Sequence, residues 1–220
     1  MRTQADIRLA SQTGSNQCPS LKHPAGGVYF IYFLLLCSTF TLSPEAFAEE
    51  KGIMIVRVSD YQQDNTLLLD SESLFHLPEQ VKQAIHHEIP LNFKTEIRLL
   101  EETRWMGMTF QRTRFDLEYY TRLYAYGVNH HYVLYNTRNN KVQTFETLES
   151  ALQTLGTLRA FPIAHLAELH PEQRYTLEMK ISLDRWKLPA PLIIESFMDP
   201  DWHLESDWFE SIIETPKSWQ

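Results

Sequence analysis

The chain has 220 residues, of which 43% are hydrophobic, and a formal net charge of −8 at pH 7. This length suits one domain with a substantial core and does not require two. Because an acidic protein repels phosphate groups, we expect neither nucleic acid nor anionic lipid as a partner.

Residues 1–48 have the features of a secretory signal peptide. Three basic residues precede the apolar stretch Val28–Leu42, and Ala46-Phe47-Ala48 follows it. A basic start, a short apolar core and a small-residue site are typical of such peptides. The stretch is shorter than the ~20 residues of a spanning helix. We therefore expect export to the periplasm and cleavage after Ala48, with an uncleaved inner-membrane anchor as the alternative. The long basic region leaves the translation start open.

Residues 49–220 then form a single periplasmic domain without cysteine. Cys18 and Cys37 both lie in the removed segment, which also carries one more basic than acidic residue, so the remaining net charge is −9. The absence of thiols excludes disulfides, thiol catalysis and cysteine-ligated metals from the domain.

Two strands and a helix are expected first. The apolar run Gly52–Val58 indicates a buried strand, and Thr66–Phe75 a second strand after a turn. Pro78 suits the first position of a short helix, because proline lacks only an amide proton that would have no partner there. Pro90 ends that segment.

The alternation that begins at Leu91 predicts a long β-hairpin. Apolar and polar residues alternate strictly over Leu91–Leu99, and the pattern resumes after Gly107 and continues to Tyr126. We expect Glu96 opposite Arg114, so that opposite charges meet on the solvent face. The face expected to be buried carries Phe115, Leu117, Tyr119, Leu123 and Ala125.

Further strands and one helix follow the hairpin. We expect strands at His131–Asn136, at Arg159–Ala164 on a sheet edge, and at Tyr175–Leu183. Thr147 can cap a helix between the first two of these strands, and Gly156 stands where a left-handed C-cap would lie.

The last part, 188–220, is expected to be an extended C-terminal segment. The prolines of Leu188–Leu192 disfavour helix in the residues before them, and Ile193–Phe197 is read as a final strand. The predicted fold is mainly β of the α+β class: a single domain with an antiparallel sheet or β-sandwich and two short docked helices. Strand order is left open.

Arginine and aromatic residues mark a candidate binding surface. Both types are enriched at the energetic centres of protein interfaces. Part of this surface lies on the solvent side of the long second strand, and part lies in the adjoining turn or the C-terminal segment. The alternative is that a helix or the C-terminal segment covers this face and makes the tyrosines core residues. The candidate residues are Arg104, Trp105, Arg112, Arg114, Tyr120, Arg122, Tyr124 and Trp202.

The sequence contains no motif that indicates a catalytic or metal site. The histidine pairs His86-His87 and His130-His131 lack the i, i+4 spacing with which a helix shares one ion, and no G-x-S-x-G sequence is present. We predict no metal, no cofactor and no catalytic residue. An envelope enzyme that uses carboxylates such as Glu101, Glu102 or Asp201 is the alternative.

Several short stretches together resemble a family of exported bacterial proteins known as domain of unknown function 4390. The first are Ile89–Phe93, Arg104-Trp105 and Leu117–Arg122, followed by Thr147–Leu152, Leu188–Leu192 and Asp201–Trp208. Met106 departs from the pattern, since relatives tend to carry a second tryptophan there. The resemblance implies an export signal, a compact envelope domain and an accessory role beside a membrane sensor kinase. It brings no catalytic residues.

These observations favour a non-enzymatic binding or accessory module that docks another envelope protein. The alternatives are the carboxylate enzyme and a structural protein held by an uncleaved N-terminal helix. We expect the protein to contact the membrane only through the signal segment, before that segment is cleaved. The identity of the partner and the oligomeric state stay open.

Overall fold

The computed structural model describes residues 52–213, except 128, 130 and 172. The predicted signal peptide, its cleavage site at Ala48 and the end of the chain lie outside these residues. The described residues fall within one compact unit, Ala48–Gln220. No helix of the described part is long and apolar enough to cross a membrane.

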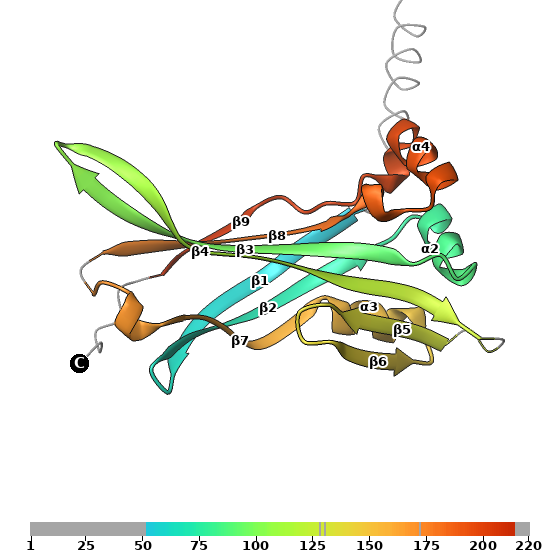
Figure 1. The fold of residues 1–220 in the computed structure, drawn as a ribbon, viewed down its shortest axis with the longest axis horizontal. Helices are drawn as coiled ribbons and strands as arrows, with labels where there is room; N and C mark the ends of the chain where they lie inside the picture. Colours follow the sequence, from blue (N-terminus) through green and yellow to red (C-terminus); the bar gives the residue numbers. More distant parts are fainter. Residues whose placement is uncertain (1–51, 128, 130, 172, 214–220) are drawn as a thin grey trace, which may run out of the picture. The chain divides into compact units, whose positions relative to one another are not determined.

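Two antiparallel sheets build the unit (Figure 1). The smaller sheet has the order β1-β2-β7, and the larger has the order β6-β5-β4-β3-β8-β9. The predicted mainly-β fold is thereby confirmed. The strands are β1 (Gly52–Gln63), β2 (Thr66–His76), β3 (Leu91–Trp105), β4 (Met108–Tyr126), β5 (His131–Asn136), β6 (Lys141–Phe145), β7 (Thr157–His165), β8 (Arg174–Leu183) and β9 (Phe209–Ile213). The helices are α2 (Glu79–His86), α3 (Leu148–Leu155) and α4 (Ala190–Met198), with 3-10 turns η1 (Leu166–Glu168), η2 (Arg185–Lys187) and η3 (Pro200–Trp202).

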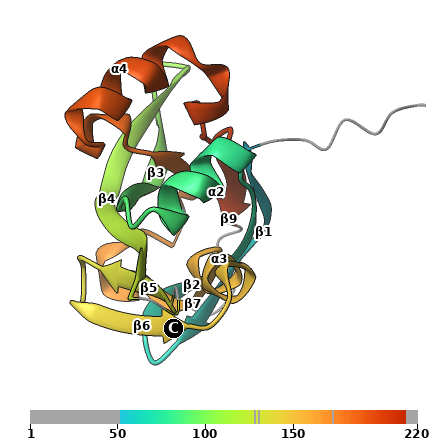
Figure 2. The same cartoon turned by 90° about the vertical axis from the view of Figure 1, so that its right-hand side faces the viewer.

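The core lies where the inner faces of the two sheets meet. Phe93 of β3 contacts Phe75 of β2 edge to face, with ring centroids 5.4 Å apart, and Tyr119 of β4 stacks on Phe161 of β7. Helix α2 covers one end of this core, with Val81 fully buried (Figure 2). Full burial of each large apolar side chain contributes roughly 1.5–3 kcal/mol, so these rows hold the sheets together.

The long hairpin is confirmed, but its register differs from the prediction. Glu96 lies opposite Glu118 rather than Arg114. The difference arises because the turn contains only two residues and because β4 bulges at Arg114, between the partners of Leu99 and Leu100. Lys94 lies between the two facing acids, with its Nζ 3.0 Å from Glu96 and 3.9 Å from Glu118.

The expectation of an extended chain after Leu188 is wrong, because Ala190–Met198 forms helix α4. Pro189 precedes the helix and Pro191 lies in its first turn, where no amide donor is needed. A proline in the first turn therefore starts this helix rather than preventing it. Further along, Phe209–Ile213 pairs with β8 as strand β9.

Helix α3 begins as predicted and ends differently. The Thr147 side chain accepts a hydrogen bond from the Ser150 amide at 3.2 Å. Gly156 has a φ of −79°, so it is not left-handed. Its role is close packing: the Ser73 amide donates to its carbonyl at 2.8 Å, and a Cβ at this position would clash with the Ser73 carbonyl.

Candidate functional site

The far end of the hairpin extends beyond the sheet that carries it. We call residues Thr103–Gln111 the tip ribbon. Strand β3 pairs with β8 only as far as Glu102, and β4 pairs with β5 only from Thr121 onward. Among the described strands the tip ribbon therefore pairs only within the β3–β4 hairpin, and it projects from one end of the larger sheet (Figure 1).

One face of the tip ribbon is apolar. Trp105 pairs directly with Met108, and Phe110 lies two residues further along the same face. Their exposed fractions are 62%, 55% and 47%. Arg104 and Thr109 form the next cross-strand pair, on the opposite, polar face. The ribbon thus repeats the alternation of a buried hairpin, but within residues 52–213 no second layer covers its apolar side.

The turn of the ribbon holds a further exposed apolar residue in an unfavourable backbone conformation. Met106 has a φ of 50° and Gly107 a φ of 79°, as a type I′ turn requires. Asparagine, aspartate or glycine is the usual residue at the first position, and a left-handed residue of another type costs about 1–3 kcal/mol. The Met106 side chain is 80% exposed, so packing within the unit does not offset this cost.

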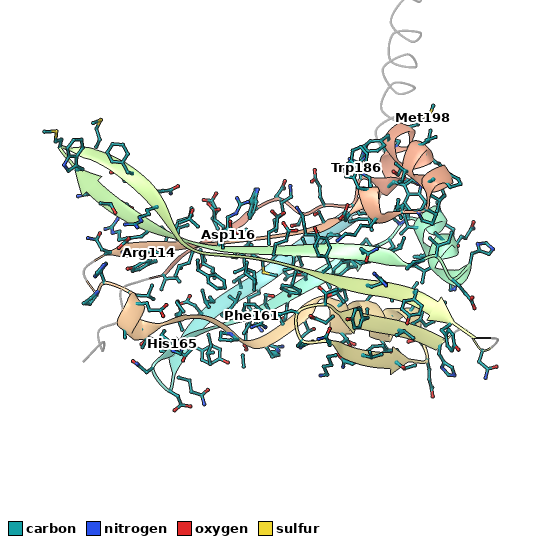
Figure 3. The ribbon with its side chains drawn as sticks, viewed as in Figure 1. Arg114, Asp116, Phe161, His165, Trp186 and Met198 are labelled. Carbon is teal, nitrogen blue, oxygen red and sulfur yellow. The ribbon has the colours of Figure 1, made fainter. Side chains whose placement is uncertain are left out.

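An ion pair between Glu101 and Arg114 lies where the ribbon begins; Figure 3 labels Arg114 at this place in the sheet. Glu101 is 3% exposed, and its Oε2 accepts a hydrogen bond from Arg114 Nε at 2.6 Å. The Tyr175 hydroxyl donates to Glu101 Oε1 at 3.3 Å. The bond from Arg114 is the main reason that the pKa of Glu101 lies below its ordinary value. The pair therefore anchors the root of the ribbon.

The bulge divides the predicted binding surface into separate parts. It turns Arg112 to the face of Trp105 and directs Arg114 to Glu101. Arg104 and Trp105 remain with Arg112 at the ribbon. The structure thus brings together only the part of the surface that lies near the turn.

The tyrosine part of the predicted surface lies near the other end of β4. Tyr120 and Tyr124 are half-buried there, and Arg122 is exposed and donates from Nε to Asn92 Oδ1 at 3.2 Å. The Tyr120 hydroxyl donates to Glu118 at 2.5 Å, which raises the pKa of Tyr120 to about 12. These residues do not join Trp105 in one patch.

Trp202 is removed from the candidate surface because it lies in the core. It is 1% exposed and belongs to η3, behind helix α4. Conversely, Met106, Met108 and Phe110 were not predicted. The apolar alternation of Met108 and Phe110 was visible in the sequence, but the bulge hid its continuity with Phe115.

The carboxylates considered for catalysis do not converge. Glu101 and Glu102 are neighbours on one strand and therefore point to opposite faces. Asp201 lies in η3. A polar groove of about 420 Å³ does contain Glu118, Asp184 and Glu205, but each of these has a lysine within 4 Å. In the part of the chain that is described, no three His, Cys, Asp or Glu side chains are arranged to hold a metal ion.

Comparison with known proteins places the chain in a family without assigning an activity. The model of domain of unknown function DUF4390 matches residues 50–211, which include every strand from β1 to β8 and most of β9. Searches of curated proteins and of solved structures give no match. Since the match covers most of the chain, the protein belongs to the DUF4390 family.

Proposed function

We propose that this protein is a non-enzymatic module of the bacterial envelope that docks another envelope protein through its tip ribbon. The N-terminal segment directs export, and the folded unit works in the periplasm. The observation that carries the proposal is the apolar face of a ribbon against which the described part of the chain places no second layer.

An uncovered apolar face on a projecting ribbon does not increase the free energy of unfolding of the unit. A two-stranded hairpin is marginally stable alone, and Met106 adds backbone strain at its turn. Exposed tryptophan, phenylalanine and methionine are instead the side chains that protein interfaces bury at their centres. Trp105, Met108 and Phe110 supply these on one face.

The charges near the ribbon suggest the chemistry of the partner. Arg104 lies on the polar face of the ribbon, with its Nε 3.9 Å from Glu102, and Arg112 lies at the root of the ribbon on the face of Trp105; both arginines are exposed. A partner that receives the tip would therefore offer an apolar pocket with carboxylates at its rim. Such complementarity mainly increases the association rate and selects the orientation, while the apolar contacts provide affinity.

The resemblance to exported DUF4390 proteins suggests which protein to test first. The family implies an accessory role beside a membrane sensor kinase, and a sensor domain in the periplasm would lie within reach of an exported module. We therefore propose the periplasmic part of such a kinase as the first partner to examine.

In-cell photocrosslinking tests the docking proposal. A photoreactive amino acid replaces Met106, which is 80% exposed on the ribbon, or Val142, which is 59% exposed on β6 and serves as the control. We expect one envelope protein, identified by mass spectrometry, to be captured from position 106 and not from position 142. The additional substitution Trp105→Ala should abolish the adduct while leaving the circular dichroism spectrum unchanged.

Two results would contradict docking by the tip. One is the same set of adducts from both positions, which would indicate random collisions. The other is a position-106 adduct that persists in the Trp105→Ala variant, which would mean that the apolar face is not the contact.

A further inference from the structure

A second exposed apolar surface lies at the other end of the unit. We define the α4 patch as Trp186, Ile194, Phe197 and Met198, which are 74%, 68%, 44% and 82% exposed. Trp186 belongs to η2 and the others to α4. A cluster of this kind on a soluble unit marks a surface that meets another molecule or a membrane.

The α4 patch is held in a defined arrangement. The rings of Trp186 and Phe197 pack with centroids 4.9 Å apart, and the Arg185 guanidinium lies 4.7 Å from the Phe197 centroid. Arg185 Nη1 also donates to the Ser196 carbonyl at 3.0 Å. The patch is therefore built by specific contacts between η2 and α4.

Both sides of helix α4 are apolar. Leu192 and Ile193 pack on the core, while Ile194, Phe197 and Met198 point away from it. Glu195 is the only charged residue in the helix. A helix that is apolar around most of its circumference needs an apolar environment on its outer side as well.

The position of the patch in the unit indicates what that environment is. Helix α4 lies at the same end of the unit as the start of strand β1, whose first residue is Gly52 (Figures 1 and 2). Only the nine residues 43–51 separate Gly52 from the apolar stretch Val28–Leu42. Nine residues span at most about 30 Å, so this end of the unit stays close to the membrane while that stretch is inserted, before cleavage or throughout if the segment remains as an anchor.

From this juxtaposition we propose that the α4 patch inserts into the surface of a phospholipid bilayer. Tryptophan is enriched at the membrane–water boundary, and an interfacial helix buries its apolar face shallowly below the headgroups. Figure 3 shows Trp186 and Met198 on the outside of this end of the unit. The proposal goes beyond the expectation that only the N-terminal segment meets the membrane.

The charges around the patch specify the kind of lipid contact. Lys187 Nζ lies 3.6 Å from Asp184, Arg185 Nη1 donates to the Ser196 carbonyl, and helix α4 itself carries the acidic Glu195. The patch therefore has no excess positive charge to attract anionic lipid. Insertion depends on the apolar side chains and occurs equally with zwitterionic phosphatidylcholine.

A pair of matched probes tests this proposal with the full chain in phosphatidylcholine vesicles. Met198 and Met106 are 82% and 80% exposed. They belong to helix α4 and to the β3–β4 turn, which lie at opposite ends of the unit. Each is changed to cysteine after Cys18→Ser and Cys37→Ser, and is labelled with a polarity-sensitive fluorophore. We expect nitroxide groups on the lipid acyl chains to quench the probe at position 198 several-fold more than the probe at 106.

Each other outcome overturns the proposal. Equal quenching at both positions would indicate unspecific adsorption, and no quenching at position 198 would show that the patch stays in water. A blue shift at 198 without lipid quenching, which grows with protein concentration, would assign the patch to a second copy of the chain. The test is independent of docking by the tip ribbon, because that proposal requires a protein adduct at position 106.

Discussion

The tip ribbon and the α4 patch are both exposed and apolar, but they differ in what lies behind them. Trp105 belongs to a ribbon of two strands with solvent on both faces. Trp186 packs on Phe197 of a helix whose other side, through Leu192 and Ile193, rests on the core. One surface is supported only by its own hydrogen bonds, and the other is part of the packed unit.

This difference matches the two surfaces to different kinds of contact. A ribbon without a second layer opens locally at low cost, so it can adapt to a protein pocket. A helix fixed on the core holds its outward side chains in one fixed plane, which suits the flat surface of a bilayer. Substitutions of side chains in or behind the two surfaces should therefore change the free energy of unfolding by unequal amounts.

The largest effect is expected behind the α4 patch. Trp202→Ala removes a 1% exposed side chain from η3 and should lower the free energy of unfolding by about 3–5 kcal/mol. Urea denaturation measures this value. Trp186→Ala, on the outer side of the same region, is the matched control and should cost about 1 kcal/mol, because it loses one aromatic contact. Equal losses in the two variants would mean that the patch is not supported from behind.

A smaller, pH-dependent effect is expected at the root of the ribbon. The pKa of Glu101 is lowered in the folded state from its ordinary 4.5, so its pairing with Arg114 stabilises the fold at pH values above 4.5. This contribution declines as the pH falls through the folded-state pKa. In Glu101→Gln the melting temperature should therefore fall less steeply between pH 5 and pH 3 than in the wild type; this interval runs from about half a unit above the ordinary value to about 1.5 units below it. Parallel melting curves at all pH values would contradict this role, and Glu102→Gln is the control.

The smallest effect is expected at the tip itself. Replacing Trp105 and Phe110 together by serine should change the free energy of unfolding by less than about 0.5 kcal/mol, because both side chains are exposed and lack a second layer. Urea denaturation again provides the measurement. A loss of 2 kcal/mol or more, roughly that of a buried large side chain, would show that another part of the protein covers the ribbon.

Local patterns in the sequence predicted where strands and helices lie better than they predicted which residues pair between strands. The alternation over Leu91–Leu99 predicted a strand with one buried face, and Thr147 predicted the start of a helix. The register of the hairpin was wrong because a bulge at Arg114 leaves no clear pattern. Helix α4 was missed because a proline next to another apolar residue fits both an extended chain and a first helical turn.

The candidate surface shows the same limit. Trp105 and Trp202 were both chosen as exposed aromatic residues, and the structure leaves only Trp105 exposed. Their local sequences do not distinguish them, since burial depends on elements distant in the chain. Met108 and Phe110 carry an alternating pattern like that of Phe93 and Ile97, yet only the latter pair has a second sheet against it.

The family, the strand-rich fold and the alternation of faces along the hairpin could all be predicted from the sequence. The fold and the alternation depend on local backbone preferences and on the two-residue period of a strand. How far the second sheet extends along β3 and β4, and therefore where the apolar face changes from core to exposed surface, is seen only in the folded unit. Covering a face requires a second element from elsewhere in the chain, and no local pattern encodes where that element ends.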